Sequence, residues 1–396
     1  MMEKTLKQEI HTELTDHIIP FWDALRDEEH GGFYGRVNHD LTIDHHADKG
    51  GVLHSRILWF FSEAGRVLQD EQCLMNARHA FRFLKEHLLD GEYGGVMWTT
   101  DYRGEPADAS KHAYCQAFAI YGLSAWYRVS GEQDALTTAM RLFELLETRM
   151  RDPEGYGEAF ERDFSPQVND KLSENGVLAD RTMNTLLHVI EAYTELLRVS
   201  GDDRVRTKLT EAVRIMMDRV FDPAKGRLEV FFDKDYHSLI DLYSYGHDIE
   251  AAWLLDRAAE VLGDPVLTEK VHVMTAVLED HVLREGFDGE ALTAECEEGR
   301  VLADRIWWVQ AEAVNGFLHA WKKRPERTDF LDAARREWQY IREHVIDRRP
   351  DSEWLEQLDK AGRPDGSKPM AGLWKCPYHN GRMCLEFLLF PFETGR

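Results

Sequence analysis

"YSYGHDIEAAWLL", residues 243–255, joins an almost wholly apolar helix to three ionisable residues at its start. The second half leaves nearly no polar face, so this helix must be surrounded by protein on most sides. Yet His247, Asp248 and Glu250 stand at its beginning. Ionisable residues are costly to bury in an apolar interior, so their position at the start of this helix calls for a structural or functional explanation.

The rest of the chain repeats this kind of stretch. Short segments rich in glycine and aromatic residues recur about every 60 to 70 residues, and each suggests a small strand or hairpin. An amphipathic stretch with apolar residues at i, i+3, i+4 and i+7 precedes each segment, and a more apolar stretch follows it. The six apolar stretches begin "LHSRILWF" at 53, "KHAYCQAF" at 111, "TMNTLLHV" at 182, "GHDIEAAW" at 246, "RIWWVQAE" at 305 and "CPYHNGRM" at 376.

Six such units predict about twelve helices of two kinds. Amphipathic helices can face water, whereas apolar helices need burial on nearly all sides. An inner ring of six helices inside an outer ring of six satisfies both, so we predict an all-α fold, an (α/α)6 barrel with short β-hairpins at one end. No linker divides the chain, which predicts a single domain over residues 1–396. An open helical solenoid is the alternative.

Polar, aromatic or ionisable residues stand near the start of every apolar helix, which packing alone does not require. If these helix starts face one mouth, their side chains converge on one pocket, and the residues of "YSYGHDIEAAW" lie at its rim. The residues are His54, Arg56, His112, Tyr114, Asn184, His188, His247, Glu250, Arg305, Trp307, Trp308, Glu312, Trp374, Lys375, Tyr378, His379, Asn380 and Arg382.

His247 and Glu250 are three residues apart and share a helix face, so the carboxylate could orient the imidazole. The alternative is a satisfied core histidine beside a solvated glutamate. His-x-x-Glu also resembles di-iron spacing, but such sites need matching motifs on facing helices, and no second pair stands at an inner-helix start. We therefore expect no metal and no cofactor.

The composition of the chain limits the classes of ligand and partner that we expect. A net charge of -24 argues against nucleic acid and anionic membrane as partners. Five cysteines without a metal-finger spacing, and an N-terminus without a signal-peptide pattern, predict a soluble, cytoplasmic protein, which we expect to be a monomer. Tryptophans near hydrogen-bonding groups suit the faces and hydroxyls of a small sugar, and no nucleotide motif is present.

Several stretches together resemble a known family. They include "ELTDHIIPFWDALRDEEHGGFYG", "ADKGGVLHSRILWFFS", "KHAYCQAFAIYGLSAWY", "LSENGVLADRTMNTLLHVIEAYTEL", "YSYGHDIEAAWLLDRA", "RIWWVQAEAV" and "WKCPYHNGRMCLE". Nearly end to end, the chain resembles the N-acylglucosamine 2-epimerase superfamily, and within it the bacterial cellobiose 2-epimerases. The resemblance implies an (α/α)6 barrel and cofactor-free C2 epimerisation of the reducing-end glucose of β-1,4-linked disaccharides, cellobiose to glucosyl-mannose and lactose to epilactose.

The resemblance also implies roles for residues. His247 and His379 would be the acid/base pair, with Glu250 supporting His247, and Arg56 and His188 would contact the oxygens that change charge. Further residues would bind the sugars: Tyr114, Asn184, Asp180, Trp307, Trp308, Trp374 and Glu312. Two positions depart from the family pattern, Cys115 in place of a more polar residue and Leu373 before Trp374.

Such a reaction needs ring opening, because C2 becomes acidic only beside the open-chain aldehyde. A base then removes the C2 proton, a cis-enediol forms, and a proton returns to the other face. Histidine suits these transfers near neutral pH, and Arg56 would stabilise the enediolate oxygen. Two histidines on opposite faces, or one acting after rotation about C2–C3, both remain open.

Other functions compete with epimerisation. A glycoside hydrolase could use Glu250 and Glu312, but the two histidines would then have no role. An aldose–ketose isomerase, or an N-acylglucosamine 2-epimerase acting on a monosaccharide, would share the enediol chemistry. A non-catalytic sugar-binding protein would explain the tryptophans but not the histidine pair.

Overall fold

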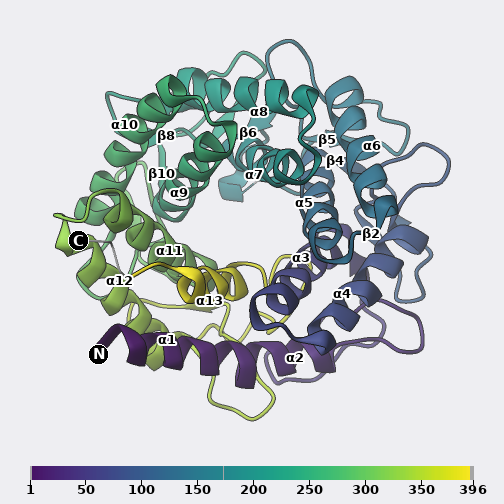
Figure 1. The fold of residues 1–396 in the computed structure, drawn as a ribbon, viewed down its shortest axis with the longest axis horizontal. Coiled ribbons are helices and arrows are strands. Elements are labelled where there is room, and N and C mark those ends of the chain that lie inside the picture. Colours follow the sequence, from purple (N-terminus) through teal and green to yellow (C-terminus); the bar gives the residue numbers. More distant parts are fainter. Residues whose placement is uncertain (1, 173, 393–396) are drawn as a thin grey trace.

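The computed structural model describes residues 2–172 and 174–392 of the 396-residue chain. Within them the helices form two concentric rings (Figure 1). Each inner helix packs on the next, and the last closes against the first. This closure confirms the (α/α)6 barrel and excludes the open solenoid. The inner helices are α3 (Gly51–Leu68), α5 (Ala113–Ser130), α7 (Met183–Ser200), α9 (Tyr245–Leu262), α11 (Trp307–Lys323) and α13 (His379–Leu389).

The outer helices cover this ring. Each packs on the inner helix that precedes it in the chain, and α1 packs on α13. Most of them end in a single π-helical turn. The outer segments are α1 (Met2–Glu13) with η1 (Leu14–Ile18) and α2 (Ile19–Ala24), α4 (Glu71–Phe83) with η2 (Leu84–Leu88), α6 (Gln133–Arg149), α8 (Asp203–Ile215) with η4 (Met216–Val220), α10 (Pro265–His281) with η5 (Val282–Gly286), and α12 (Thr328–Tyr340) with η6 (Ile341–Val345).

Tight turns reverse the chain between an inner helix and the next outer helix. After α7 and α9, Gly201 and Gly263 adopt left-handed backbone conformations that end the helix. The very next residues, Asp202 and Asp264, accept hydrogen bonds from the first backbone N–H groups of α8 and α10. A glycine followed by an aspartate therefore fixes the antiparallel pairing of inner and outer helices.

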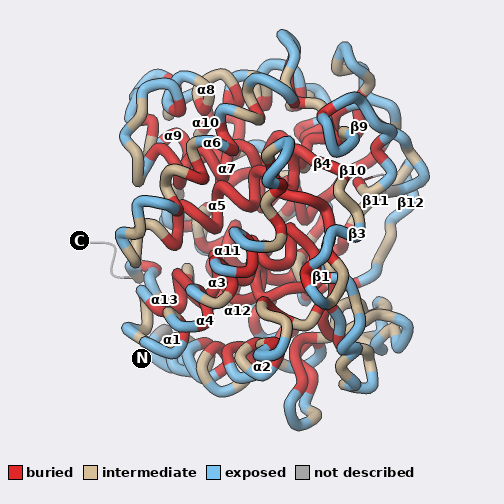
Figure 2. The backbone as a smooth tube through the Cα atoms, turned by 90° about the vertical axis from the view of Figure 1, so that its right-hand side faces the viewer, coloured by how far each residue is buried: buried red, intermediate tan, exposed pale blue. Residues whose placement is uncertain are grey.

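Burial follows the two rings. Inner helices are buried over most of their length, as the red segments of Figure 2 show. In α9, Ile249 and Trp253 are wholly buried, whereas the outer helix α10 exposes Val266 and Val273. Among the described residues, the helices are too short or too polar for one of them to cross a lipid bilayer.

Short antiparallel strands lie together at one end of the barrel (Figure 2). The strand that enters an inner helix pairs with the hairpin of the following unit, as β10 pairs with β11 before α9. A bridge between Val37 and Ala371 joins the first unit to the last. The strands are β1 (Lys49–Gly50), β2 (Thr99–Thr100), β3 (Pro106–Asp108), β4 (Lys111–His112), β5 (Ala159–Phe160), β6 (Arg181–Thr182), β7 (Phe221–Asp222), β8 (Arg227–Leu228), β9 (Phe231–Phe232), β10 (Leu242–Ser244), β11 (Glu295–Glu297), β12 (Arg300–Leu302), β13 (Arg305–Ile306) and β14 (Gln357–Leu358).

Candidate active site

Three histidines on three inner helices gather at the hairpin end of the inner ring. His188 belongs to α7, His247 to α9 and His379 to α13, and all three are buried. The Trp308 ring links two of them, with its centroid 4.7 Å from the His247 ring and 5.5 Å from the His379 ring. We call these three residues the histidine cluster. Their convergence agrees with the predicted meeting of helix starts.

His379 is held by a carboxylate from the neighbouring inner helix. Its Nδ1 lies 2.8 Å from Oε1 of Glu312, whose other oxygen accepts a hydrogen bond from Trp253 Nε1 at 3.1 Å. These donors, with Arg382, make Glu312 an acceptor, so His379 Nδ1 carries the proton. Nε2 is then the nitrogen left to accept a proton from a ligand. Glu312, predicted to bind substrate, is fully buried and holds the histidine instead.

His188 has the same arrangement within one helix. Its Nδ1 lies 2.9 Å from Oε2 of Glu191, three residues further along α7. Glu191 also accepts a hydrogen bond of 2.6 Å from the Tyr378 hydroxyl. Sequence reasoning missed Glu191, whereas it placed Tyr378 among the residues at the helix starts without predicting this contact. The i, i+3 spacing applied to His247 and Glu250 could have found Glu191.

His247 differs from the other two histidines. Its Nδ1 lies 2.8 Å from the Ser244 hydroxyl, which can donate or accept. The predicted support of His247 by Glu250 is wrong, because Glu250 Oε1 binds the Arg382 guanidinium. Glu250 stands one helical turn further along α9, where α13 faces it, and the buried guanidinium is the stronger partner for a carboxylate.

Arg382 occupies the centre of a buried charged cluster. Its Nη1 binds Glu191, and its Nη2 binds Glu250 and lies 2.6 Å from Oε1 of Glu312. One cation therefore faces three carboxylates from three different helices. Nothing in the local sequence of α13 indicates these partners, which are more than 60 residues away.

A second cation, Arg56, contacts the same Tyr378 ring as Arg382 does. Arg56 of α3 donates to the Tyr114 hydroxyl at 2.6 Å and to the Trp374 carbonyl oxygen at 3.3 Å. Its guanidinium also stacks on the rings of Phe118 and Tyr378, at 4.1 and 4.8 Å. Phe118 lies 4.6 Å from the His188 ring. Arg56 is thus fixed beside the histidine cluster.

The predicted tryptophans have different positions. Trp374 is 36 % exposed, and its ring contacts the Tyr114 and Trp98 rings at 5.8 and 5.5 Å. Trp308 is half-buried, with its ring close to those of His247 and His379. Trp307 is only 5 % exposed and lies edge-on to His379 at 5.9 Å, so it packs behind the histidine. Trp308 and Trp374 remain the candidates for sugar contact.

Two further predicted residues stand at the third inner helix. Asn184 is one turn before His188 on the same face of α7, and its buried Oδ1 has no partner among the described residues. Asp180 is exposed and lines a cavity of about 620 Å3 among the hairpins, together with Glu158 and Arg181. That cavity contains none of the histidine cluster, so the structure does not bring Asp180 to it.

Some polar helix starts serve the fold instead. His54 is wholly buried, with Nδ1 2.9 Å from the Gly50 carbonyl oxygen and Nε2 accepting from Phe33 N at 3.0 Å. Asp248 accepts from Leu228 N at 3.2 Å. The prediction that all these residues converge on one pocket is therefore wrong for His54.

Burial sets the charge states of the site. It lowers the pKa of His247 to about 3 and that of His379 well below its usual value, so both are neutral at pH 7. Burial alone would raise the pKa of Glu191, but the Arg382 charge and the His188 hydrogen bond outweigh it and hold that pKa at about 2. Burial and the Glu312 charge raise the pKa of Glu250.

Two groups of side chains in the described residues have metal-like spacing. Glu250, Glu312 and His379 lie within reach of one point, but the Arg382 guanidinium already binds both carboxylates there. This guanidinium takes the position that a metal ion would need, so the donor set does not fit a metal.

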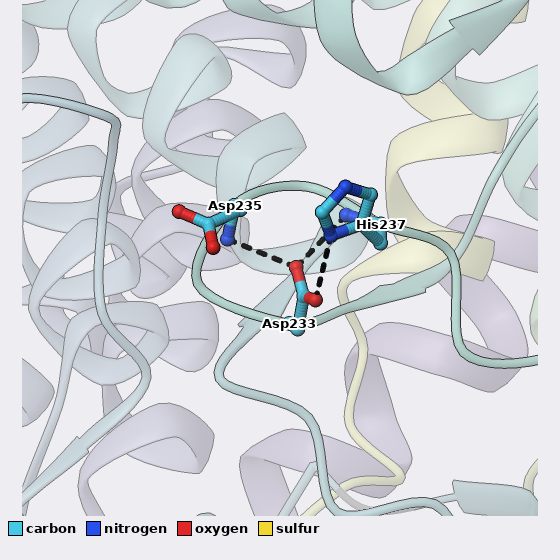
Figure 3. Close-up of side chains that lie close together, drawn as sticks. All are labelled: Asp233, Asp235 and His237. Atoms are coloured by element: carbon cyan, nitrogen blue, oxygen red, sulfur yellow. Dashed lines mark hydrogen bonds and ion pairs between the residues drawn. The ribbon is translucent and has the colours of Figure 1, made fainter.

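The second group, Asp233, Asp235 and His237, lies on an exposed turn (Figure 3). Asp233 Oδ1 accepts from the backbone N–H groups of Asp235 and His237, both at 2.9 Å. Asp359 makes the same bonds to Ala361 and Arg363 in another hairpin. Because an arginine replaces the histidine in that equivalent turn, the group is a turn motif.

The double ring of helices, with buried histidines, a fixed arginine and tryptophans gathered at its hairpin end, is the architecture of an (α/α)6-barrel enzyme. A family model for N-acylglucosamine 2-epimerase (GlcNAc 2-epimerase) matches residues 31–380, and the chain belongs to this family.

Three comparisons cover nearly the whole chain. It is 51% identical to a cellobiose 2-epimerase of Eubacterium cellulosolvens, covering 98% of this chain and 99% of that protein. The crystal structure of a sugar epimerase from a ruminal bacterium matches with a TM-score of 0.96 at 46% identity, covering 97% and 98% of the two chains. The structure of cellobiose 2-epimerase from Bacillus thermoamylovorans B4167 matches with a TM-score of 0.94 at 43% identity, covering 98% and 99%.

Proposed function

We propose that the protein epimerises C2 of the reducing-end glucose of β-1,4-linked disaccharides, converting cellobiose to glucosyl-mannose and lactose to epilactose. The observation that carries this proposal is the placement of the His247 and His379 rings 4.7 and 5.5 Å from the Trp308 ring, with His379 Nδ1 anchored by Glu312. Similarity to cellobiose 2-epimerases at 51% and 43% identity supports the substrate class.

The reaction follows from the protonation states. His188, with its proton on Nδ1, accepts the anomeric hydroxyl proton at Nε2 as the C1–O5 bond breaks, and the imidazolium ion so formed gives that proton to the ring oxygen. Neutral His379 or His247 then removes the C2 proton and becomes an imidazolium ion. That ion returns the proton to the opposite face after rotation about C2–C3, or the other histidine takes a proton from solvent and delivers it to that face while the imidazolium ion loses its own proton to solvent. His247 is suited to either direction because its serine partner can donate or accept. Arg56 stabilises the enediolate oxygen.

The test is NMR analysis of products from cellobiose in D2O. We expect glucosyl-mannose with deuterium at C2 of the reducing-end sugar, because a proton held on imidazole exchanges with solvent before it returns. A hydrolase would release glucose and leave C2 protium in place. An isomerase would return the proton to C1 and yield a ketose as the main product. Glucose released at the rate of substrate loss, without a manno-configured product, would overturn the proposal.

A further inference from the structure

Arg382 connects two of the histidines without touching either by hydrogen bond. It is fully buried on α13, one turn beyond His379. Its two terminal nitrogens point to different partners, since Nη1 binds Glu191 and Nη2 binds Glu312. Each of these carboxylates binds Nδ1 of one histidine, at 2.9 Å for His188 and 2.8 Å for His379.

We propose that Arg382 is a positioning residue that fixes the tautomers of His188 and His379 together, because one guanidinium binds both carboxylates that accept their Nδ1 protons. The proposal rests on the proposed function, in which both histidines need a free Nε2 electron pair. Arg382 would therefore control the tautomers needed for two steps, ring opening at His188 and proton transfer at His379.

The chemistry of the guanidinium explains why arginine stands here. Its planar fork reaches two carboxylates at once, whereas a lysine ammonium is a single point charge. Without this cation, buried carboxylates take up protons. A protonated carboxyl group donates to Nδ1, and the imidazole then carries its proton on Nε2. Such a histidine can no longer accept a proton from the sugar.

Other ionisable groups also face these histidines and remain when Arg382 is changed. Arg56 and the neighbouring imidazoles act on His379, and Arg56 also acts on His188. Within the described residues, these groups include Arg56 on α3, Tyr114 on α5, Glu191 on α7, His247 and Glu250 on α9, Glu312 on α11, and Tyr378 immediately before α13. Of these, Glu191 and Glu312 bind the Nδ1 atoms, so their protonation decides the tautomers.

The test compares Arg382→Met and Arg382→Lys with a matched control, Arg257→Lys. Arg257 binds Glu386 through both ends, at 2.8 and 2.6 Å, and lies 4.7 Å from the Trp253 ring. Arg382 lies 4.8 Å from the same ring. The two arginines therefore share packing and charge pairing, but the partner of Arg257 binds none of the histidine cluster.

The first readout is histidine 15N NMR of the free protein, with His188 and His379 assigned by single substitutions. We expect Nδ1-protonated rings in the wild type and in Arg257→Lys, and a shift toward Nε2 protonation in both Arg382 variants. This readout does not depend on turnover, so it separates this proposal from the proposed function. An inactive wild-type protein would overturn the function, whereas unchanged tautomers in folded Arg382→Lys would overturn the positioning role.

The second readout is the pH profile of cellobiose epimerisation. We expect kcat to fall about 100-fold in Arg382→Lys with KM within about threefold, because misplaced reacting groups cost that much while buried Arg382 does not touch substrate. In Arg382→Met the acid limb of kcat/KM should move to higher pH, since Glu191 loses the charge that lowers its pKa. An acid limb that stays at the wild-type pH would contradict the proposal.

Discussion

At the start of α9, three ionisable residues have three different tasks. His247 joins the histidine cluster, Asp248 binds the backbone of the preceding hairpin at Leu228, and Glu250 binds Arg382 on α13. Successive helix residues point about 100° apart, so neighbours in sequence meet different partners. An apolar inner helix can therefore begin with ionisable residues because each of them has a hydrogen-bond partner on another segment or at the helix start.

Removing either proposed acid/base histidine should nearly abolish turnover. We expect His247→Ala and His379→Ala to lower kcat about 10²–10⁴-fold, the usual loss when a positioned acid or base is deleted. Cellobiose conversion followed by NMR gives the rates, and circular dichroism checks the fold. His237→Ala on an exposed turn is the control and should retain full activity. Near-wild-type rates in either cluster variant would refute its catalytic role.

Chelation should leave activity unchanged. Glu250 and Glu312 face Arg382, so a guanidinium already supplies the cation between them. We expect equal rates before and after exhaustive dialysis against EDTA. Loss of activity that a single divalent ion restores would contradict the mechanism.

The exposed tryptophan should matter more for a disaccharide than for a monosaccharide. Trp374 is 36 % exposed, and its ring contacts the rings of Tyr114 and Trp98. We expect Trp374→Ala to lower kcat/KM for cellobiose about 5- to 13-fold, since a lost aromatic contact of about 1–1.5 kcal/mol corresponds to that factor. Rates with glucose should change less. Equal kcat/KM for glucose and cellobiose in the wild type would remove the case for a second sugar site.

The repeated pattern was enough to predict which residues open the inner helices, but not all of their partners. His188 and Glu191 follow a local spacing that sequence can reveal. The contacts of Arg382 with Glu191, Glu250 and Glu312 depend on how three other helices meet α13. Such contacts follow from ring closure, which a local pattern does not encode.

At the scale of elements, side chains of the inner helices attach the hairpins. The fourth residue of three inner helices accepts a backbone N–H from the preceding hairpin. These pairs are His54 with Phe33 N, Gln116 with Val96 N and Asp248 with Leu228 N. The hairpins carry no long sheet of their own, so these bonds fix where each inner helix begins. Several polar helix starts are therefore structural.

Replacing Asp248 by asparagine should stabilise the protein at neutral and alkaline pH. Burial raises the pKa of Asp248 well above its usual value, and its Oδ2 has no partner among the described residues. Because the pKa of Asp248 is higher in the folded than in the unfolded protein, its contribution to the stability of the folded state is fully present below the unfolded pKa, near 3.9. That contribution is lost as the pH rises toward the folded pKa. Asparagine keeps the acceptor for Leu228 N and does not titrate.

The gain should therefore grow with pH. We expect the free energy of unfolding of Asp248→Asn, relative to wild type, to increase by about 1.4 kcal/mol per pH unit above about pH 4, until the folded pKa is reached. Urea unfolding at pH 4, 6 and 8 measures it. A difference that is the same at all three pH values would contradict a protonated Asp248.

Helix periodicity predicted the elements well because burial differs sharply between the rings. The apolar stretches correspond to the inner helices α3, α5, α7, α9, α11 and α13, and the amphipathic stretches correspond to the outer helices. The sequence predicted the pairing of the strands less well than it predicted the helices. Strands of two or three residues give little alternation to read, and their partners lie in the next unit.

At the scale of the molecule, both ends of the chain complete the ring. The side chain of Lys7 in α1 donates to the carbonyl oxygens of Leu388 and Phe390 at the end of α13. At the hairpin end, Val37 N donates to Ala371 O at 3.0 Å, which joins the first unit to the last. Because α13 carries His379 and Arg382, closure of the ring also assembles the site.

A closed ring should unfold as one unit, and we propose a single domain over residues 1–396. Every inner helix buries two flanks against neighbours, so losing one helix exposes two others, whereas the end repeats of an open array can unfold alone. Urea unfolding followed by far-UV circular dichroism and by tryptophan fluorescence should give coincident curves.

Val37→Pro removes the N–H that closes the ring. We expect it to lower the midpoints of both curves together, which corresponds to a loss of about 3 kcal/mol of stability. Val301→Pro, on the exposed strand β12, leaves the ring closed and should change stability far less. Two separate transitions in the wild type, or a Val37→Pro effect seen by only one probe, would show that the units unfold independently.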